Sequence, residues 1–184
     1  HGFRLAFEAH PQTEIVALCD TNQQVLDEAH EDFGDRIRTY LDFEEMLDLD
    51  LDIVLVSTPM HCHVPQSSLA LERGIHVISE VTAGVSVEEC RKLVEVARKS
   101  HAKYMMAENY TYMKPNVLVR AMAEAGVFGD IYFAEGEYVH DCKSLHYDDD
   151  GNPTWRSAWQ VGLRGCTYGT HSLGPCLQWL GERV

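Results

Sequence analysis

Short apolar runs alternate with helix-type spacing along the first 107 residues of the chain. The strand-like runs occupy 14–20, 52–58, 75–80 and 103–107. The stretches with helical spacing occupy 21–33, 42–47, 64–73 and 86–97. Strands that read as continuous apolar runs between helices are buried on both faces, which is typical of a parallel sheet. The pattern therefore predicts an α/β fold with a doubly wound parallel sheet.

Local signals mark where several of these helices begin and end. Gly34 and Gly74 each follow a helical stretch, as glycine does at a helix C-terminus. Ser86 and Glu89 have the S-x-x-E spacing of a capping box, which places the start of the next helix.

The pattern changes after Pro115. A helix is predicted over 116–125, and it ends at Gly126. Residues 130–140 then alternate between apolar and polar side chains, which is typical of a strand with one exposed face. A last apolar helix ends at Leu180. We therefore expect two domains, over residues 1–114 and 115–184, the second beginning a mostly antiparallel sheet.

Charge and composition exclude some classes of partner. The 29 acidic residues outnumber the 15 Lys and Arg residues by 14, and no basic cluster interrupts this balance. A nucleic-acid partner is not expected, because binding a phosphate backbone requires a basic face. No apolar run approaches the roughly 20 residues of a membrane helix. None of the six cysteines forms a C-x-x-C pair, so we expect free thiols and a reducing, cytoplasmic location.

Asp20 ends the first apolar run. In a dinucleotide-binding fold an acid at this place binds the adenosine ribose hydroxyls, and its charge would favour NAD over NADP. The alternative is that Asp20 caps the next helix at Thr21 or Asn22. The glycine motif of such a fold should lie about 20 residues earlier, at or before His1. Since the chain also begins without Met, we expect His1 not to be a natural start.

The chain resembles the Gfo/Idh/MocA oxidoreductases in five segments that follow one another in the family's order. These are EIVALCD at 14–20, STPMHCHVP at 57–65, GIHVISE at 74–80, AENYTYMKP at 107–115 and FGDIYFAEGEY at 128–138. The resemblance implies an N-terminal Rossmann domain and a second α/β domain with a large, mostly antiparallel sheet. It also implies that the first strand and glycine loop precede His1 and that most of the second sheet follows Val184.

Two departures from the family pattern narrow the resemblance. Most members have Glu-Lys-Pro where this chain has Glu80-Val81-Thr82, and valine cannot transfer protons. The usual D-x-G-x-H-x-x-D segment keeps only Gly169 and His171. The motifs M-x-E-N at 106–109, Y-x-H-D at 138–141 and Y-x-T-H-x-x-G-P at 168–175 are similar to those of NAD-dependent α-N-acetylgalactosaminidases, although Gly169 stands where those enzymes usually have Pro.

Cofactor contacts are expected where strands end, because α/β sheets bind ligands at that edge. The resemblance implies that Thr58, Pro59 and His63 line the cofactor groove and that Glu80 lies beside the nicotinamide ribose. Asn109 offers both a donor and an acceptor to a carboxamide or a sugar hydroxyl. Alternatives are that His61 and His63 pack against the next helix or, with a third ligand such as Cys62 or His140, bind a metal. We expect no metal.

Catalytic candidates follow from the same motifs. Tyr138 and His140 share one face of the predicted strand and suit proton relay, although a surface pair is the alternative. His171 begins a helix, which would favour a neutral imidazole base, with a capping role as the alternative. Glu108 is a further candidate for proton transfer. The resemblance adds Asp141 and Tyr168 as substrate-binding residues. The run Asp148–Asn152 lacks the last acid of a calcium loop and predicts an exposed turn.

These expectations support one leading hypothesis for the function. It is an NAD-dependent enzyme that acts on a sugar by hydride transfer. In one form of this hypothesis the enzyme is a redox-neutral glycoside hydrolase that oxidises the sugar, eliminates the aglycone, adds water and reduces the product. One alternative is an ordinary sugar or polyol dehydrogenase, and absence of the usual Lys at Val81 counts against it. A second is a non-catalytic, cofactor-binding sensor. The family resemblance also implies a homo-oligomer.

Overall fold

The computed structural model describes residues 2–162 and 168–181. The chain divides into two compact units, His1–Asp52 and Ile53–Val184. The domain boundary predicted between residues 114 and 115 is not tested by this division and stays a prediction.

The first unit is a small parallel β-α-β arrangement with flanking helices. Its elements are α1 (Gly2–Ala9), β1 (Ala17–Cys19), α2 (Gln23–Phe33), the 3₁₀ turn η1 (Gly34–Arg36), β2 (Arg38–Tyr40) and α3 (Phe43–Met46). Strands β1 and β2 pair in parallel, with Ala17 opposite Arg38. The sequence pattern did not predict α1 or β2. Strand β2 is exposed at two of its three residues, so it carries no apolar run.

Predicted helix ends in this unit match the structure. The Asn22 side chain accepts a hydrogen bond from the Gln24 N–H at the start of α2, and Gly34 ends the helix with φ = 60°. Asp42 caps α3 in the same way, through the N–H groups of Glu44 and Glu45. Satisfying these N–H groups stabilises each helix start by about 0.5–2 kcal/mol.

The second unit begins with a three-stranded parallel sheet, which confirms the predicted α/β fold. Its elements are β3 (Ile53–Val56), the 3₁₀ turn η2 (Met60–Cys62), α4 (His63–Glu72), β4 (His76–Ser79), α5 (Val87–Lys99) and β5 (Tyr104–Met106). The strand order is β3-β4-β5, and both pairs are parallel. Helix α4 packs against α5, β3 and β4. The three strands therefore end at one edge of the sheet.

The sheet is buried only in part, because Ile53 of β3 and Met105 of β5 are 42% and 56% exposed although the pattern predicted burial on both faces. Its core contains the other apolar residues of the pattern. Val56, Val77 and Leu71 are each 1% exposed.

The Ser86 half of the predicted capping box is present, since Ser86 Oγ accepts from the Glu89 N–H. The Glu89 carboxylate accepts from the Val85 N–H, one residue before the cap, rather than from Ser86. Helix α5 therefore begins where its sequence predicts.

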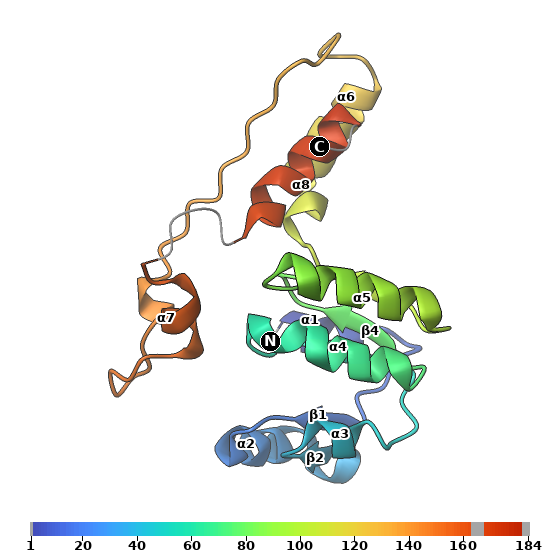
Figure 1. Ribbon diagram of the computed structural model, residues 1–184, viewed down its shortest axis with the longest axis vertical. Helices are drawn as coiled ribbons and strands as arrows, with labels where there is room; N and C mark the ends of the chain where they lie inside the picture. The colour runs from blue at the N-terminus through green and yellow to red at the C-terminus, as the bar shows by residue number, and fades with distance from the viewer. Residues whose placement is uncertain (1, 163–167, 182–184) are drawn as a thin grey trace. The chain divides into compact units, whose positions relative to one another are not determined.

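After β5, the regular secondary structure of the described residues is helical. It contains the 3₁₀ turns η3 (Tyr110–Tyr112) and η4 (Lys143–Leu145) and the helices α6 (Lys114–Glu124), α7 (Trp155–Gln160) and α8 (Gly169–Leu180). Helix α6 starts earlier than expected, because Pro115 fits a first helical turn. Helices α6 and α8 lie side by side (Figure 1), and Trp179 Nε1 donates to the carbonyl oxygen of Asn116.

The strand predicted over 130–140 is wrong for the described structure. These residues have no regular secondary structure, and Tyr132 and Val139 are 98% and 91% exposed. A strand exists only where a neighbouring chain segment accepts and donates its hydrogen bonds, and the described residues supply no such neighbour to 130–140. Among them the only antiparallel pairing is the bridge between Tyr147 and Pro153, so the predicted antiparallel sheet is not present there.

Several smaller expectations can be compared with the structure. Asp148 accepts hydrogen bonds from the N–H groups of Asn152 and Asp150, which confirms the predicted turn and lowers the pKa of the Asp148 carboxyl.

The five described cysteines form no disulfide, and Cys166 lies outside the described residues. Within residues 2–162 and 168–181 no helix is both long and apolar enough to span a membrane. The same residues hold no group of three or more potential metal ligands.

Candidate active site

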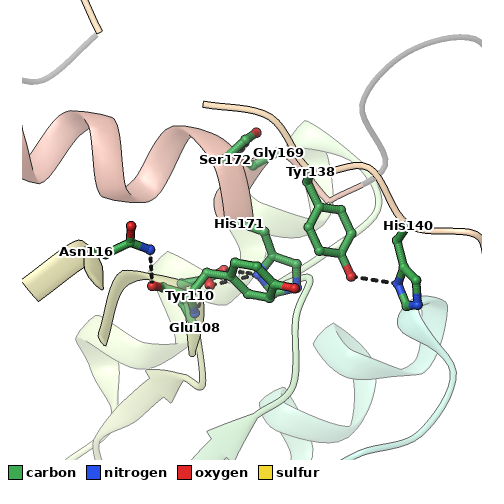
Figure 2. A network of polar contacts seen from close by, with 8 residues as sticks. All are labelled: Glu108, Tyr110, Asn116, Tyr138, His140, Gly169, His171 and Ser172. Carbon is green, nitrogen blue, oxygen red and sulfur yellow. Dashed lines mark hydrogen bonds and ion pairs between the residues drawn. The ribbon is translucent and has the colours of Figure 1, made fainter. Parts of the chain in front are cut away.

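Glu108 and His171 form a hydrogen-bonded pair in the second unit. Glu108 follows β5, and His171 lies in the first turn of α8. The His171 Nδ1 atom lies 2.7 Å and 3.0 Å from the two carboxylate oxygens of Glu108 (Figure 2). Both side chains are 10% exposed. Because an ionised carboxylate can only accept, Nδ1 carries the proton, and a neutral imidazole then presents Nε2 as a base.

Three tyrosine rings surround the His171 imidazole. Their centroids lie 4.4 Å away for Tyr110, 4.8 Å for Tyr138 and 5.6 Å for Tyr168, whose ring is nearly parallel to the imidazole. The three rings therefore enclose the imidazole, and Glu108 holds its Nδ1 atom.

Tyr138 and His140 meet through a hydrogen bond, as their spacing predicted, although they do not lie on a strand. The Tyr138 hydroxyl lies 2.9 Å from His140 Nδ1 (Figure 2). Burial, followed by the neighbouring Tyr110, raises the pKa of Tyr138 to about 12. The phenol is therefore protonated at neutral pH and suited to donating or relaying a proton.

Tyr168 is held by two donors from α7. Its hydroxyl oxygen accepts hydrogen bonds from Arg156 Nη1 at 3.0 Å and from Gln160 Nε2 at 3.2 Å. With both lone pairs engaged, the Tyr168 O–H can donate to a ligand. Sequence analysis did not select Arg156, Gln160 or Tyr110. Tyr110 lies within the AENYTYMKP segment of the resemblance, but no local signal distinguishes the other two.

The predicted cofactor residues of the second unit follow its strands at one edge. Thr58 and Pro59 follow β3, and the Thr58 hydroxyl donates to Gln66 Oε1 at 2.6 Å. The Glu80 N–H donates to the carbonyl of Val56, which ties the end of β4 to β3. Asn109 follows β5 and is exposed. Their roles toward a cofactor stay predictions.

The two histidines near η2 have different surroundings. His63 is buried, with Nδ1 2.6 Å from the Thr82 carbonyl oxygen and Nε2 2.8 Å from that of Thr58. It thus ties the segment after β3 to the segment after β4. The His61 ring stacks on Trp159, with centroids 5.2 Å apart. Packing and loop positioning therefore account for both rings.

Two predicted residues have local contacts outside this cluster. Asp141 is exposed and accepts a hydrogen bond from the Lys143 N–H at the start of η4. In the first unit, Asp20 follows β1 and accepts from the Asn22 N–H at 2.8 Å, while Asn22 itself caps α2. These contacts leave the ligand roles of Asp141 and Asp20 as predictions.

Open parallel α/β sheets bind their ligands, dinucleotides among them, at the carboxyl ends of the strands, where this chain has its polar side chains. The sequence profile GFO_IDH_MocA, described as "Oxidoreductase family, NAD-binding Rossmann fold", matches residues 3–108. The chain belongs to this family. The match confirms the predicted family, its Rossmann-like fold and NAD as its cofactor.

Curated relatives of the chain are glycosyl hydrolases by name. The chain is 34% identical over 177 residues to "Glycosyl hydrolase family 109 protein 1" of Shewanella sp. (strain MR-4). It is 33% identical over the same length to "Glycosyl hydrolase family 109 protein" of Shewanella baltica (strain OS155). Each match covers 91% of this chain and 39% of the relative, so the chain spans well under half the length of these proteins.

Solved structures of the same family have a similar fold. The WlbA dehydrogenase from Bordetella pertussis, solved with NADH and UDP-GlcNAcA, is 26% identical and has a TM-score of 0.65 over 69% of this chain and 37% of its own. Apo scyllo-inositol dehydrogenase from Lactobacillus casei has a TM-score of 0.78 over 95% of this chain and 49% of its own. At 18% identity the second likeness shows the fold alone.

Proposed function

We propose that the protein is an NAD-dependent enzyme that acts on a sugar or sugar derivative, with His171 as its base. The observation that carries this proposal is the Glu108–His171 pair, in which a carboxylate orients an imidazole among three tyrosine rings. An oriented carboxylate and imidazole suit removal of a hydroxyl proton, and tyrosine and carboxylate groups can hydrogen-bond sugar hydroxyls.

The proposed NAD contacts suit the chemistry of that cofactor. Asp20 in the first unit offers carboxylate acceptors to ribose hydroxyls, and its negative charge opposes a 2′-phosphate. In the second unit, Glu80 and Asn109 offer acceptors and donors to the nicotinamide ribose and carboxamide. The contribution of His63 is indirect. Its Nε2 atom contacts the carbonyl oxygen of Thr58 and so fixes the backbone of Thr58 and Pro59. When bound, NAD supplies an acceptor for a hydride from a sugar carbon.

His171 performs the first proton transfer in this proposal. Its Nε2 accepts the proton of the sugar hydroxyl on the carbon that is oxidised. The imidazolium that results is stabilised by Glu108 at Nδ1. A positioned general base of this kind contributes about 10²–10⁴-fold to the rate.

The similarity to family 109 glycosyl hydrolases favours a redox-neutral cycle. Oxidation at C3 of the sugar acidifies the C2 hydrogen, elimination then expels the aglycone, and water adds before the ketone is reduced. Tyr138 is protonated at neutral pH, so we assign it to proton donation, relayed through His140. Glu108, whose carboxylate also orients His171, is the second candidate for the proton steps at C2 and at the leaving group. Tyr168 and Asp141 are the proposed contacts to sugar hydroxyls.

An ordinary sugar dehydrogenase is the second candidate, and the similarity to WlbA dehydrogenase favours it. Val81, where the family usually has Lys, counts against it. The third candidate is a sensor that binds the cofactor without catalysis. The assembled contacts between Glu108, His171 and Tyr138 count against that role, because a non-catalytic protein has no need to orient an imidazole base.

A glycoside assay with and without NAD tests these candidates. The purified protein is incubated with nitrophenyl glycosides, and both aglycone release and NADH absorbance are recorded. NAD-dependent aglycone release without accumulated NADH supports the hydrolase. Stoichiometric NADH with no aglycone supports the dehydrogenase. Calorimetric NAD binding with neither product supports the sensor.

The family resemblance also leads us to propose that the protein forms a homo-oligomer. Sedimentation of the purified protein tests this proposal, and a single monomeric species across concentrations would contradict it.

A further inference from the structure

We propose that Tyr110 is the positioning residue of this site, fixing Glu108 and His171 and facing Tyr138. The inference rests on the proposed function, since it concerns the same cluster. Tyr110 begins η3, directly between β5 and α6. Its backbone contacts Glu108, and its ring contacts both His171 and Tyr138.

The backbone of Tyr110 orients the Glu108 carboxylate. The Tyr110 N–H donates to Glu108 Oε1 at 2.8 Å, and this same oxygen lies 2.7 Å from His171 Nδ1. The carboxylate therefore has one donor from the backbone and one from the imidazole. The second donor on one oxygen restricts rotation of the carboxylate. It therefore fixes the orientation of the carboxylate toward His171 Nδ1.

Asn116 fixes the other side of the same peptide segment. Its Nδ2 donates to the Tyr110 carbonyl oxygen at 2.6 Å (Figure 2). The backbone carbonyl of Asn116 in turn accepts from Trp179 Nε1 of α8. Tyr110 is thus tied to α6 and, through it, to the helix that carries His171.

The ring of Tyr110 lies against both proton-transfer candidates. Its centroid is 4.4 Å from that of His171, tilted by 33°, and 5.1 Å from that of Tyr138 in an edge-to-face arrangement. Such aromatic pairs contribute packing with a preferred geometry. Tyr110 also raises the pKa of the Tyr138 phenol, after burial as the larger cause.

Tyr112 provides a matched control in the same turn. It is 70% exposed, whereas Tyr110 is partly buried against His171 and Tyr138. The two tyrosines share a residue type and a 3₁₀ turn, so the variants Tyr112→Phe and Tyr112→Leu report general effects of changing a tyrosine there.

Nuclear magnetic resonance of the purified chain tests the proposal without requiring turnover. The titration of Tyr138 is followed by its labelled ring carbon, assigned with Tyr138→Phe, and the protonation of His171 by its labelled ring nitrogens. We expect Tyr110→Phe to shift the Tyr138 midpoint downward from about 12. We expect Tyr110→Leu, which keeps the backbone hydrogen bonds but removes the ring packed against His171, also to shift the resonances of the His171 ring nitrogens. The Tyr112 variants should leave both signals as in the wild type.

If Tyr110→Leu does not fold, the conservative variant Tyr110→Phe still tests the proposal. Tyr110→Phe retains the ring and the backbone hydrogen bonds, and circular dichroism checks its fold. A Tyr138 midpoint in Tyr110→Phe equal to that in Tyr112→Phe would overturn the proposal. So would His171 ring-nitrogen resonances in a folded Tyr110→Leu that equal those in Tyr112→Leu.

The same experiment separates this inference from the proposed function. Shifts at Tyr138 and His171 without any NAD-dependent activity would support the positioning role and reject the enzyme. With activity, Tyr110→Leu should lower kcat at least roughly tenfold with little change in the KM for NAD, because only the general base is displaced. Equal kcat in Tyr110→Leu and Tyr112→Leu would overturn the positioning role.

Discussion

The His171 Nδ1 atom lies 2.7 Å from Glu108 Oε1, although the two residues are 63 positions apart in the chain. This contact joins the end of β5 to the first turn of α8. It determines which nitrogen of the imidazole is left as a base. Several expected outcomes depend on it.

Replacing His171 should remove the general base. We expect His171→Ala to lower turnover roughly a hundredfold or more, the usual scale for such a loss, with nearly unchanged NAD affinity. Steady-state kinetics and calorimetry measure the two effects. His101→Ala, at an exposed histidine, is the control. Full activity in the His171 variant would remove this residue from the mechanism.

Replacing Tyr138 should separate the two chemical steps. If the reaction is the elimination and addition cycle, Tyr138→Phe should slow aglycone release more than single-turnover reduction of NAD, because the phenol is needed only after oxidation. Both rates are measured on a nitrophenyl glycoside. Equal slowing of the two rates would place the phenol in the oxidation step instead.

Tyr138 should also make stability depend on alkaline pH. Its pKa is raised from 10.0 to about 12 in the folded protein. Between these values the unfolded chain has released the proton and the folded chain keeps it, so the free energy of unfolding falls as pH rises. Below about pH 10 this contribution is fully present. Urea unfolding across the range should show a steeper fall in the wild type than in Tyr138→Phe, and equal slopes would contradict the prediction.

Gly136 should tolerate no larger side chain. A Cβ atom there would lie 2.4 Å from the Ser172 carbonyl oxygen and 3.0 Å from Cys176 Sγ. We expect Gly136→Ala to lower the free energy of unfolding by about 1–3 kcal/mol, as overpacking does, and to displace nearby Tyr138. Urea unfolding measures the loss.

Gly174→Ala is the matched control for this prediction. Its Cβ would meet only the Thr111 Oγ1 atom, at 2.8 Å, and alanine favours the helical backbone of α8. The Gly174 variant should therefore lose less stability than the Gly136 variant. The opposite order would show that residue 136 does not pack against α8.

Two substitutions at Asp20 test whether its negative charge, rather than its hydrogen bond to the Asn22 N–H, determines the choice of cofactor. Asp20→Asn keeps an oxygen that can accept from the Asn22 N–H, whereas Asp20→Ala removes it. Both should bind NAD more weakly and discriminate less against NADP, because the charge that opposes a 2′-phosphate is lost. Calorimetry with the two cofactors measures this. Unchanged affinities in both variants would leave Asp20 as a local turn residue.

The parallel strands and their helices could be predicted from the sequence because the signals for them are local. Each signal acts within one helical turn or one strand. The capping residue Ser86, the stop at Gly74 and the apolar run at 52–58 each specify a nearby backbone state, and the structure has a helix or strand where each predicts. The prediction of a strand over 130–140 was wrong because alternation of apolar and polar residues describes only one of the two segments that must pair. A partner segment must be present for the ladder to form.

The candidate site was predictable only where motifs occupy the ends of elements. Glu108 and His171 were selected individually, but their contact depends on how α8 packs after β5. The donors to Tyr168 come from α7, which has no motif that would associate Arg156 with a hydroxyl 12 residues away. His63 shows the converse, since its position after β3 suggested contact with a cofactor while packing turned both ring nitrogens to backbone carbonyls.

The division into two units makes the molecule spectroscopically asymmetric. All three tryptophans, Trp155, Trp159 and Trp179, belong to the unit Ile53–Val184, and the unit His1–Asp52 has none. Indole fluorescence therefore follows the second unit alone, while far-ultraviolet circular dichroism follows the helices of both. Unfolding curves from the two signals would superimpose if the units unfold together and would separate if they do not. A comparison of the two curves therefore measures how strongly the unfolding of one unit is coupled to that of the other, without any added label.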